Sequence, residues 1–319
     1  MTPTLQDIRA AQERIAPHVI RTPLLRMQNL DRFLGCQVYV KAECMQSTGS
    51  FKLRGALNKI LSLTPEQIGR GFVAASSGNH GRAVAYGAQL LGTTAAIVMP
   101  STAPRIKVEA IRALGAEVVQ CDTAQRFAVA EALCRERGCT MVHPYDDDDV
   151  IAGQGTVGLE ILDQCPDVDC VIVPVSGGGL IGGISLAVKG LAPAVKVLGA
   201  EPAALPRYCK SLAAGEPVSV PQQSTRADAL VSQRPGGKNF PIVKANTDGF
   251  CAVSDEYLLK GMKLLLTQGK LLAEPSSCIG LGALLQGSFP VTPEDKVCLV
   301  ISGGNVGLEQ LHILEEIAE

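Results

Sequence analysis

The sequence predicts an α/β protein built on mostly parallel β-sheets that are covered by helices. Strand-like apolar runs alternate with helix-like segments along most of the 319 residues, as expected for parallel strands joined by crossover helices. Hydrophobic residues make up 46% of the chain and aromatic residues only 4%, which suits a sheet core of valine, isoleucine, leucine and alanine. A chain of this length usually exceeds a single core, so we expect two domains, or one large α/β domain with an inserted lobe.

Four strands are expected in the first half of the chain, each followed by a loop and a helix. They cover residues 37–41, 71–75, 94–99 and 117–120, and the helix after the second of them is expected over 83–91. The last three strands and their helices together have the size of a compact small lobe.

Three further strands are expected in the second half, at residues 170–175, 195–200 and 297–301. The stretch 217–244 is rich in Pro, Gln, Ser and Gly and predicts a loop-rich region. In a doubly wound sheet, ligands bind at the carboxyl ends of the strands. The polar and glycine-rich motifs described below follow such strands, so we expect them to meet in one cleft.

Charge and composition exclude several classes of partner. The chain has 29 basic and 31 acidic side chains and a formal net charge of -2, so nucleic acids and anionic membranes are not expected to bind. The apolar runs are too short to cross a bilayer, and the N-terminus lacks the apolar segment of a secretory signal, so we expect a soluble cytoplasmic protein. Eleven cysteines without a Cys-x-x-Cys pair indicate buried free thiols rather than disulfides or a zinc site.

Lys52 is the first candidate for chemistry. It stands between Phe51 and Leu53 at the expected start of a helix, behind a Thr-Gly-Ser turn. An amine that is partly desolvated by such neighbours loses affinity for its proton and can attack a carbonyl group. A lysine whose stem packs on the protein while its amine reaches solvent is the alternative, and is the commoner case for a single lysine.

The glycine-rich loop at residues 176–183 follows a buried strand and precedes a helix. Successive glycines allow backbone amides to turn towards an anion, and the helix N-terminus adds a partial positive charge, so the loop predicts a phosphate site. Gly177, Gly179 and Gly182 also fit Gly-x-Gly-x-x-Gly, and Glu201 follows the next strand. A nicotinamide-dependent dehydrogenase is therefore an alternative.

Residues 76–81, Ser-Ser-Gly-Asn-His-Gly, lie between a strand and a helix. Two hydroxyl groups, an amide and the free N-H groups of a helix start can bind a carboxylate, although simple N-capping would explain one such residue. We expect His80 to make a contact here rather than to act as a base.

Two other polar segments are less specific. Ser302, in the segment Ser-Gly-Gly-Asn after the last strand, is expected either to meet a ring nitrogen or to cap a helix. The aspartates at 146–149 predict a solvated turn, and residues 143–144 and 153–156 are expected to shape the rim of the cleft.

Together the motifs resemble those of the fold-type II pyridoxal-phosphate enzymes, and within them the serine/threonine dehydratase and serine racemase branch. They occur in family order at residues 50–55, 76–81, 177–179 and 302–305. The resemblance implies two open, mostly parallel twisted sheets with helices on both faces, as in the tryptophan synthase β-like fold.

The resemblance also implies a division into domains. We expect a large cofactor-binding domain of residues 1–69 and 146–319, and a small mobile domain of residues 70–145. We further expect a homodimer, and a catalytic core without an effector-binding extension.

The resemblance implies roles for matching residues. Lys52 would hold pyridoxal 5'-phosphate and take the Cα proton of the substrate, and Ser77 would be the acid/base on the opposite face. Cofactor contacts would come from Phe51, Lys52, Asn79, Gly177, Gly178, Gly179, Leu180 and Ser302. Substrate contacts would come from Ser76, Ser77, Asn79 and His80.

The chain departs from the branch near the cleft. Relatives that bind Mg²⁺ or Ca²⁺ use a glutamate matching Glu201, a carbonyl matching Leu205, and an aspartate where this chain has Arg207. A guanidinium cannot ligate a cation, so we expect no metal here and an ion pair of Arg207 with Glu201. Tyr145 replaces an asparagine of the racemases.

We therefore expect a pyridoxal-phosphate lyase that converts a small β-hydroxy-α-amino acid of the serine or threonine type to a 2-oxo acid and ammonia. The neutral Ser302 at the ring nitrogen favours β-elimination over transamination. The alternatives are an amino-acid racemase and a 3-hydroxyaspartate dehydratase, whose second carboxylate Arg126 or Arg226 would bind. Competitors from other classes are the dehydrogenase and a non-catalytic amino-acid-binding module.

Overall fold

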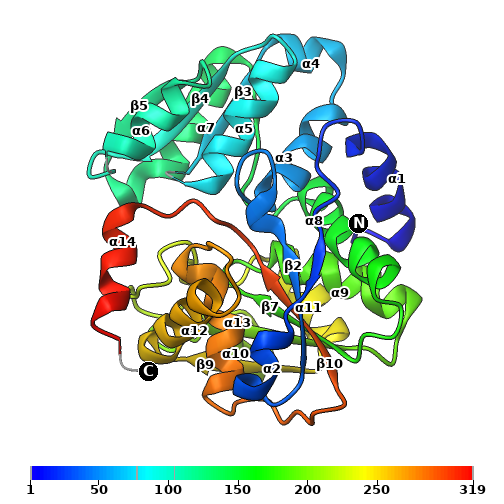
Figure 1. Ribbon diagram of the computed structural model, residues 1–319. Coiled ribbons are helices and arrows are strands. Elements are labelled where there is room, and N and C mark those ends of the chain that lie inside the picture. The colour runs from blue at the N-terminus through cyan, green and yellow to red at the C-terminus, as the bar shows by residue number, and fades with distance from the viewer. Residues whose placement is uncertain (1, 77, 104, 318–319) are drawn as a thin grey trace.

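The computed structural model describes residues 2–76, 78–103 and 105–317, and within them the chain forms two twisted sheets. Figure 1 shows the four-stranded sheet above the six-stranded one, with α3 (Lys52–Leu61) between them. The two sheets and their covering helices give the α/β architecture that the sequence predicts.

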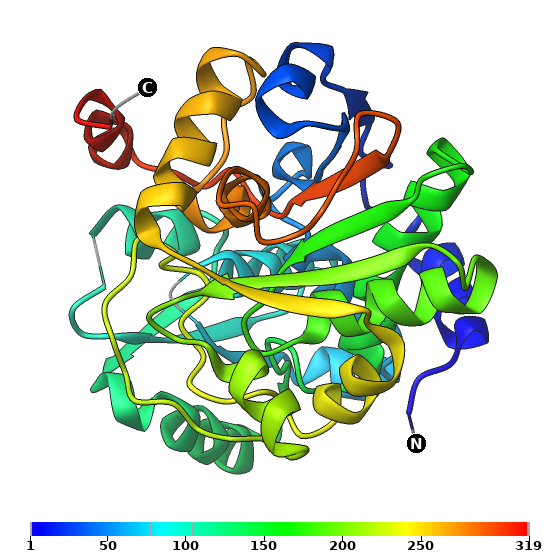
Figure 2. The same ribbon diagram turned by 90° about the horizontal axis from the view of Figure 1, so that it is seen from below.

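The large sheet has the strand order β1-β2-β10-β7-β8-β9. All neighbours pair in parallel except β1 and β2, and Figure 2 shows the twist of these strands from below. Their bounds are β1 (Leu24–Arg26), β2 (Gln37–Ala42), β7 (Cys170–Pro174), β8 (Lys196–Pro202), β9 (Gly249–Val253) and β10 (Lys296–Ile301).

Helices cover both faces of the large sheet because successive residues of a strand point to opposite sides. In β7, Ile172 joins the core formed with α2, α12 and α13, whereas Val171 and Val173 join the core formed with α8, α9 and α11. The helices of this part of the chain are α1 (Leu5–Ile15), α2 (Gln28–Leu34), α8 (Asp148–Gln164), α9 (Gly179–Leu191), α10 (Arg207–Ala214), α11 (Asn239–Asn246), α12 (Asp255–Thr267) and α13 (Ile279–Leu285).

The small sheet has the order β5-β4-β3-β6 and is parallel throughout. Phe72 and Ala74 of β3 face α5 and α6, and Val73 and Ala75 face α7. Its elements are α4 (Pro65–Gly69), β3 (Phe72–Ala75), α5 (Asn79–Leu90), β4 (Ala95–Pro100), α6 (Arg105–Arg112), β5 (Glu117–Cys121), α7 (Arg126–Arg137) and β6 (Thr140–Met141).

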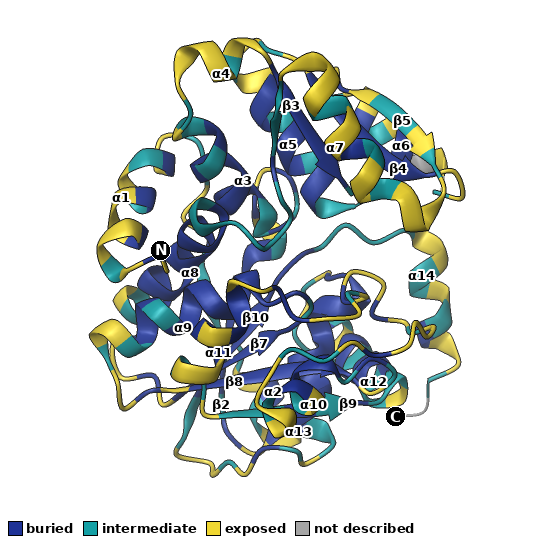
Figure 3. Ribbon diagram, turned by 180° about the vertical axis from the view of Figure 1, so that it is seen from behind, coloured by how far each residue is buried: buried dark blue, intermediate teal, exposed yellow. Residues whose placement is uncertain are grey.

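The last α-helix of the described chain is α14 (Leu308–His312), which lies below α6 in Figure 1. Short 3-10 helices connect other elements, namely η1 (Glu43–Met45), η2 (Thr123–Gln125), η3 (Pro275–Cys278) and η4 (Ile313–Glu315). Figure 3 shows that the central strands and the inward helix faces are buried, while α4, the edge strand β5 and the outer side of α7 are partly or largely exposed. In the residues that the structure describes, no helix combines the length and apolar character needed to span a membrane.

The expected strands agree with the structure to within two residues at each end. The sequence analysis missed three short or partly exposed strands, β1, β6 and β9, because their apolar signal is weak. It also placed α11 inside a loop-rich stretch. All eleven cysteines are free, and six of them are buried.

The prediction of a solvated turn at residues 146–149 is wrong for most of this run, because Asp147 is the N-cap of α8 and Asp148 and Asp149 are its first two residues. The Asp147 carboxylate accepts hydrogen bonds from the Asp149 and Val150 N-H groups at 2.9 and 3.1 Å, which caps the helix. Lys59 pairs with Asp147 at 2.9 Å. Aspartates near a helix N-terminus also interact favourably with its dipole.

The prediction that residues 153–156 shape a cleft rim is also wrong, since they lie buried inside α8. A Cβ on Gly153 would be 2.6 Å from the Gly55 Cα, and one on Gly155 would be 2.9 Å from the Gly183 carbonyl oxygen. The glycines therefore let α8 approach α3 and α9 closely, which keeps the start of α3 in place.

Candidate active site

A cavity of about 660 Å³ lies at the carboxyl ends of β3, β7 and β10. The polar segments that follow these strands all contribute to its wall, as the sequence analysis predicts. The predicted site residues that line it are Phe51, Lys52, Ser76, Asn79, His80, Arg126, Gly177, Gly178, Gly179, Leu180 and Ser302. Ser77, predicted as the second acid/base, lies outside the described residues.

Lys52 is the first residue of α3, and the preceding backbone ties it to β10. The Phe51 N-H donates to the Ser302 carbonyl oxygen at 3.0 Å, and Ser50 forms a β-bridge with Gly303. The Lys52 amine donates to the Pro144 carbonyl oxygen at 2.6 Å inside the cavity. Burial lowers the pKa of Lys52 to about 8, against the opposing effect of the Glu274 carboxylate. The amine is therefore a buried group of the cavity that holds its proton weakly, and not a surface cation.

A buried ion network holds the first turn of α3. The Arg54 guanidinium binds the Glu43 carboxylate at 2.8 and 2.9 Å and the Glu160 carboxylate at 2.6 and 2.8 Å. The Lys41 amine adds a 2.6 Å contact to Glu160. Because these charges are buried and mutually paired, removing one of them would leave the others uncompensated. The network therefore fixes the helix that carries Lys52.

The glycine-rich loop is shaped as an anion cradle. Gly178 has a φ of 104°, which residues with a Cβ rarely adopt. A Cβ on Gly178 would collide with the Tyr208 hydroxyl group, and a Cβ on Gly177 would collide with the Tyr145 ring. The loop leads into α9, whose first N-H groups have no partner within the helix. A phosphate group suits this position.

Ser302 presents a neutral hydroxyl group to the cavity and is oriented by a second serine. Its hydroxyl oxygen lies 2.9 Å from that of Ser277, which also accepts a 2.7 Å hydrogen bond from the Gly303 N-H. Both serines are buried. The pair therefore offers a fixed hydroxyl group that can donate to or accept from a ring nitrogen.

Asn79 begins α5 and is held from two sides. Its side-chain N-H group donates to Glu274 at 2.9 Å, and its carbonyl oxygen accepts from Asn305 at 2.7 Å. Arg82 in turn donates to the Asn305 carbonyl oxygen. Burial raises the pKa of Glu274 to about 7, although the hydrogen bond from Asn79 opposes this shift. These contacts fix the N-terminus of α5 at the cavity wall.

His80 makes a structural contact. Its Nε2 lies 2.8 Å from the Val142 carbonyl oxygen, and burial together with the Lys52 amine lowers the pKa of His80 to about 3. The ring is therefore neutral at physiological pH, and its Nε2 donates to Val142. This agrees with the expectation that His80 is not a base.

Arg126 and Arg226 are the two arginines expected to bind the second carboxylate of a substrate such as 3-hydroxyaspartate. Arg126 lines the cavity, where its Nε donates to the Thr123 carbonyl oxygen at 2.9 Å. Arg226 is exposed and its backbone N-H binds Asp255 at 2.9 Å. Lys107 also lines the cavity and pairs with Asp228 at 3.3 Å. The structure therefore brings Arg126 and Lys107 to the cavity wall.

The sequence analysis missed Glu274, Ser277 and Arg82. Each is positioned by a contact with a residue far away in the chain, so no local pattern marked them. A signal was present in Glu274-Pro275-Ser276-Ser277, where an acid and two serines interrupt an otherwise apolar stretch. A charged group between apolar segments is seldom buried without a partner.

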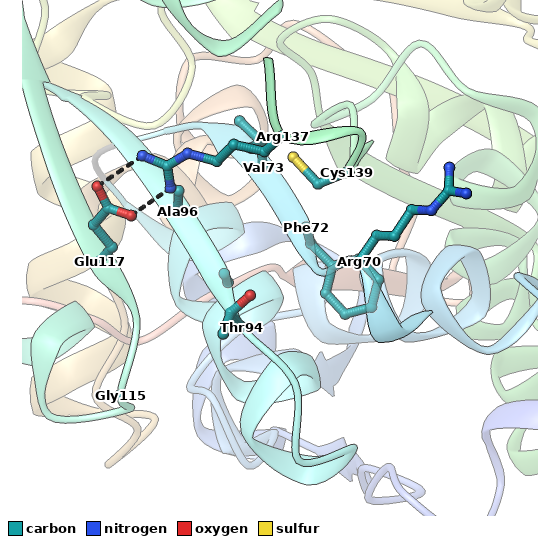
Figure 4. Close-up of a pocket in the computed structure, with 10 residues that line it drawn as sticks. Arg70, Phe72, Val73, Thr94, Ala96, Gly115, Glu117, Arg137 and Cys139 are labelled. Carbon is teal, nitrogen blue, oxygen red and sulfur yellow. Dashed lines mark hydrogen bonds and ion pairs between the residues drawn. The ribbon is translucent and has the colours of Figure 1, made fainter. Parts of the chain in front are cut away.

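A second cavity of about 150 Å³ lies at the amino ends of β3, β4 and β5, away from the motifs (Figure 4). Arg137 on its wall binds Glu117 at 2.5 Å, as the dashed lines in Figure 4 mark. The charge of this arginine is already compensated, and ligands of such sheets bind at the opposite, carboxyl ends. This cavity does not belong to the active site.

The dehydrogenase interpretation depends on Glu201, and the structure removes its basis. Glu201 is fully buried and accepts hydrogen bonds from the Tyr208 and Cys209 N-H groups at 2.9 and 2.8 Å. A carboxylate that caps α10 in this way is not free to bind a ribose.

The fold and the cavity define an α/β enzyme that holds a phosphorylated carbonyl cofactor. A reactive amine at Lys52, an anion cradle at Gly178 and a fixed hydroxyl group at Ser302 surround one space and fit pyridoxal phosphate. Residues 15–303 match the family described as pyridoxal-phosphate dependent enzymes. The chain belongs to this family.

Its relatives catalyse related reactions on amino acids. The chain is 42% identical to the L-threonine ammonia-lyase of Thermotoga maritima, over 97% of this chain and 77% of that protein. It is 39% identical to the L-threo-3-hydroxyaspartate ammonia-lyase of Saccharomyces cerevisiae, over 97% and 95% of the two proteins. The structure of maize serine racemase superimposes with a TM-score of 0.94 at 38% identity, over 99% of this chain and 98% of that one.

Proposed function

We propose that this protein is a pyridoxal-phosphate-dependent ammonia-lyase that converts a small β-hydroxy-α-amino acid to a 2-oxo acid and ammonia. The observation that carries the proposal is the placement of the Lys52 amine, the glycine loop around Gly178 and the Ser302 hydroxyl group on one cavity. The named activities of the threonine and hydroxyaspartate relatives support this type of reaction.

When bound, pyridoxal phosphate supplies an electron sink for a negative charge that develops at the substrate Cα. The chain's own part is to bind, orient and move protons. The N-terminus of α5, with Ser76 and Asn79, binds the substrate carboxylate. Lys52 Nζ accepts the Cα proton, and the β-hydroxyl group gains a proton and leaves as water. Hydrolysis of the released enamine then gives the 2-oxo acid and ammonia. Because Ser302 is neutral, the electron sink is weaker than beside a carboxylate, which favours elimination over transamination.

Racemisation is the second candidate function. It requires a proton donor on the face of the substrate opposite Lys52, and Ser77 has the position in the 76–81 segment that the racemases use for it. The named activity of maize serine racemase supports this alternative. We expect Ser77→Ala to abolish racemisation and retain elimination. Persistent racemisation together with lost elimination would contradict this role of Ser77.

The choice of substrate depends on the positive side chains of the cavity wall. Arg126 and Lys107 offer positive charge at the wall to which the substrate binds. A β-carboxylate would gain a charge-assisted hydrogen bond there. We therefore include 3-hydroxyaspartate beside serine and threonine as a candidate substrate.

We also propose that residues 70–145 form a mobile unit that closes over the bound substrate and excludes water. Its separate sheet and the core between that sheet and α7 support this division. The core on the other face of the small sheet also includes residues of α1, α3 and α8. A cytoplasmic homodimer completes the proposal, and the eleven free cysteines support a reducing compartment. Sedimentation of the purified protein tests the dimer.

The test is a substrate panel assayed with protein loaded with pyridoxal phosphate. Ammonia and 2-oxo acid are measured with L-serine, L-threonine and L-threo-3-hydroxyaspartate. We expect turnover of at least one substrate and a long-wavelength absorption band of the bound cofactor. Both should be absent in Lys52→Ala and unchanged in Lys210→Ala, which alters an exposed lysine. Binding without any turnover would instead support a binding module.

A further inference from the structure

Arg207 is a fully buried cation behind the wall of the active-site cavity, at the first position of α10. Its guanidinium group donates to three carbonyl oxygens. Nε binds Leu205 at 3.0 Å, Nη1 binds Val175 at 3.2 Å and Nη2 binds Leu230 at 2.8 Å. These three contacts use the fork of the guanidinium group, which a lysine amine cannot reproduce.

The charge of Arg207 is balanced by the buried carboxylate of Glu201. The Nε of Arg207 lies 3.8 Å from Glu201 Oε2, and both side chains are fully buried. Glu201 is itself fixed by the N-H groups of Tyr208 and Cys209. Burial raises the pKa of Glu201 and lowers that of Arg207, and in each case the charge of the partner opposes the shift.

Two of the three carbonyl groups belong to segments that line the cavity. Val175 immediately precedes the glycine loop, and Leu230 lies in a second cavity-lining segment. The next residue of α10, Tyr208, donates to the Gly177 carbonyl oxygen at 3.1 Å. The segment around Leu230 is joined to the loop again by the hydrogen bond from the Ser232 N-H to Ser176 at 3.2 Å. Arg207 thus joins the start of the glycine loop to the neighbouring segment around Leu230.

A divalent cation does not fit at this position. Its nearest oxygens would be those of Glu201 and Leu205, and the positive guanidinium group already occupies the space beside them. Ca²⁺ and Mg²⁺ prefer several oxygen ligands, and an arginine offers none. In the part of the chain that the structure describes, no cluster of three His, Cys, Asp or Glu residues is arranged for a metal.

We propose that Arg207 is a resident cation, which takes the structural place of a divalent ion and keeps the glycine loop in its cofactor-binding form without any metal. A buried arginine that only fills space predicts a loss of stability when it is removed. If Arg207 is a resident cation, its removal should in addition weaken cofactor affinity. The stability of the wild-type protein should then not respond to chelators.

The first experiment measures metal content and stability of the holoenzyme. Purified protein is analysed for bound metals, and its Tm is recorded with EDTA and with added MgCl₂ or CaCl₂. We expect substoichiometric metal and the same Tm in all three conditions. A stoichiometric divalent ion whose removal by EDTA lowers the Tm would overturn the proposal.

The second experiment measures pyridoxal phosphate binding by absorption and fluorescence in variants of position 207. For Arg207→Met we expect affinity to fall by about tenfold or more, because a charged donor to three carbonyls is lost from the loop support. Lys210→Met on the same helix is exposed and serves as the matched control. If Arg207→Met does not fold, Arg207→Lys is measured instead. We expect it also to lose affinity, because a lysine amine keeps the charge but cannot hold all three carbonyl groups. Wild-type affinity in the folded variant overturns the proposal.

The third experiment converts the resident cation into a metal site. Arg207→Asp places a carboxylate beside Glu201 and the Leu205 carbonyl oxygen, which together are suitable ligands for Mg²⁺ or Ca²⁺. We expect a low Tm and weak cofactor binding in EDTA, and recovery of both when the ion is added. A Tm and an affinity in EDTA equal to those of the wild type would overturn the proposal. None of these measurements depends on the identity of the substrate.

Discussion

The burial of Lys52 predicts that its amine destabilises the apoenzyme at neutral pH. An ordinary lysine has a pKa of 10.5, and burial lowers that of Lys52 to about 8. The folded state therefore binds this proton more weakly than the unfolded state. Below about pH 8 the Lys52 amine is protonated in both states, and its burial lowers the free energy of unfolding by the full amount. This loss of stability disappears as the pH rises from about 8 to 10.5.

The magnitude follows from the two pKa values. One pH unit corresponds to about 1.4 kcal/mol, so the fall from 10.5 to about 8 corresponds to a penalty of at most about 3.5 kcal/mol. Replacing Lys52 by Met removes the penalty but leaves the Pro144 carbonyl oxygen without its donor, which costs about 1 kcal/mol. We expect apo Lys52→Met to be more stable than the wild type by about 2 kcal/mol at pH 7.

Urea unfolding of the two apoenzymes at pH 7 and pH 10 measures this difference. The advantage of Lys52→Met should shrink or reverse at pH 10, where the wild-type amine is neutral. Lys59→Met is the matched control, because the bonds to Asp147 and Asp149 outweigh burial and raise the pKa of Lys59. That variant should be less stable than the wild type at pH 7. An advantage of Lys52→Met that is equal at both pH values would refute the assigned cause.

Three further predictions concern the cofactor site and the substrate. Gly178→Ala should weaken pyridoxal phosphate binding by about a hundredfold, because the φ of 104° at Gly178 and the nearby Tyr208 hydroxyl group exclude a Cβ. Titration of the variant with the cofactor, followed by absorption, measures this affinity, and a wild-type value would contradict the prediction. Ser302→Asp should lower the ratio of elimination to transamination, measured from the products formed with serine, because a carboxylate strengthens the electron sink; an unchanged ratio would argue against contact with the ring nitrogen. Arg126→Gln should lower kcat/KM for 3-hydroxyaspartate by about tenfold or more and leave that for serine nearly unchanged, and an equal loss for both substrates would exclude recognition of the second carboxylate.

Much of the site could be predicted because its key groups lie in short segments at strand ends. Lys52 and the glycine loop each have a local pattern, and the rule that ligands bind at the carboxyl ends of parallel strands places them together. For Ser302 the sequence allows two roles, contact with a ring nitrogen or a helix cap. The structure favours the first, because its hydroxyl group lies beside that of Ser277 at the cavity.

Other contacts could not be predicted because their partners are distant in sequence. Asn79 and Glu274 are separated by 195 residues and meet at 2.9 Å. The errors at residues 146–149 and 153–156 have a similar cause, since aspartates and glycines occur in both loops and helices. Only the packing of α8 on α3 and α9 shows that they belong to a helix there.

The amino-acid sequence by itself determined the alternation of strands and helices, and it indicated the glycine-rich loop as a phosphate site and Lys52 as the candidate reactive amine. Each of these depends on neighbouring residues, whose propensities and side-chain types can be recognised along the chain. Only the tertiary structure decided the environment of the groups. Burial lowers the pKa of Lys52, and three carbonyl groups from separate segments surround Arg207. Desolvation and hydrogen bonding depend on which groups the folded chain brings together, and sequence neighbours supply only part of that set.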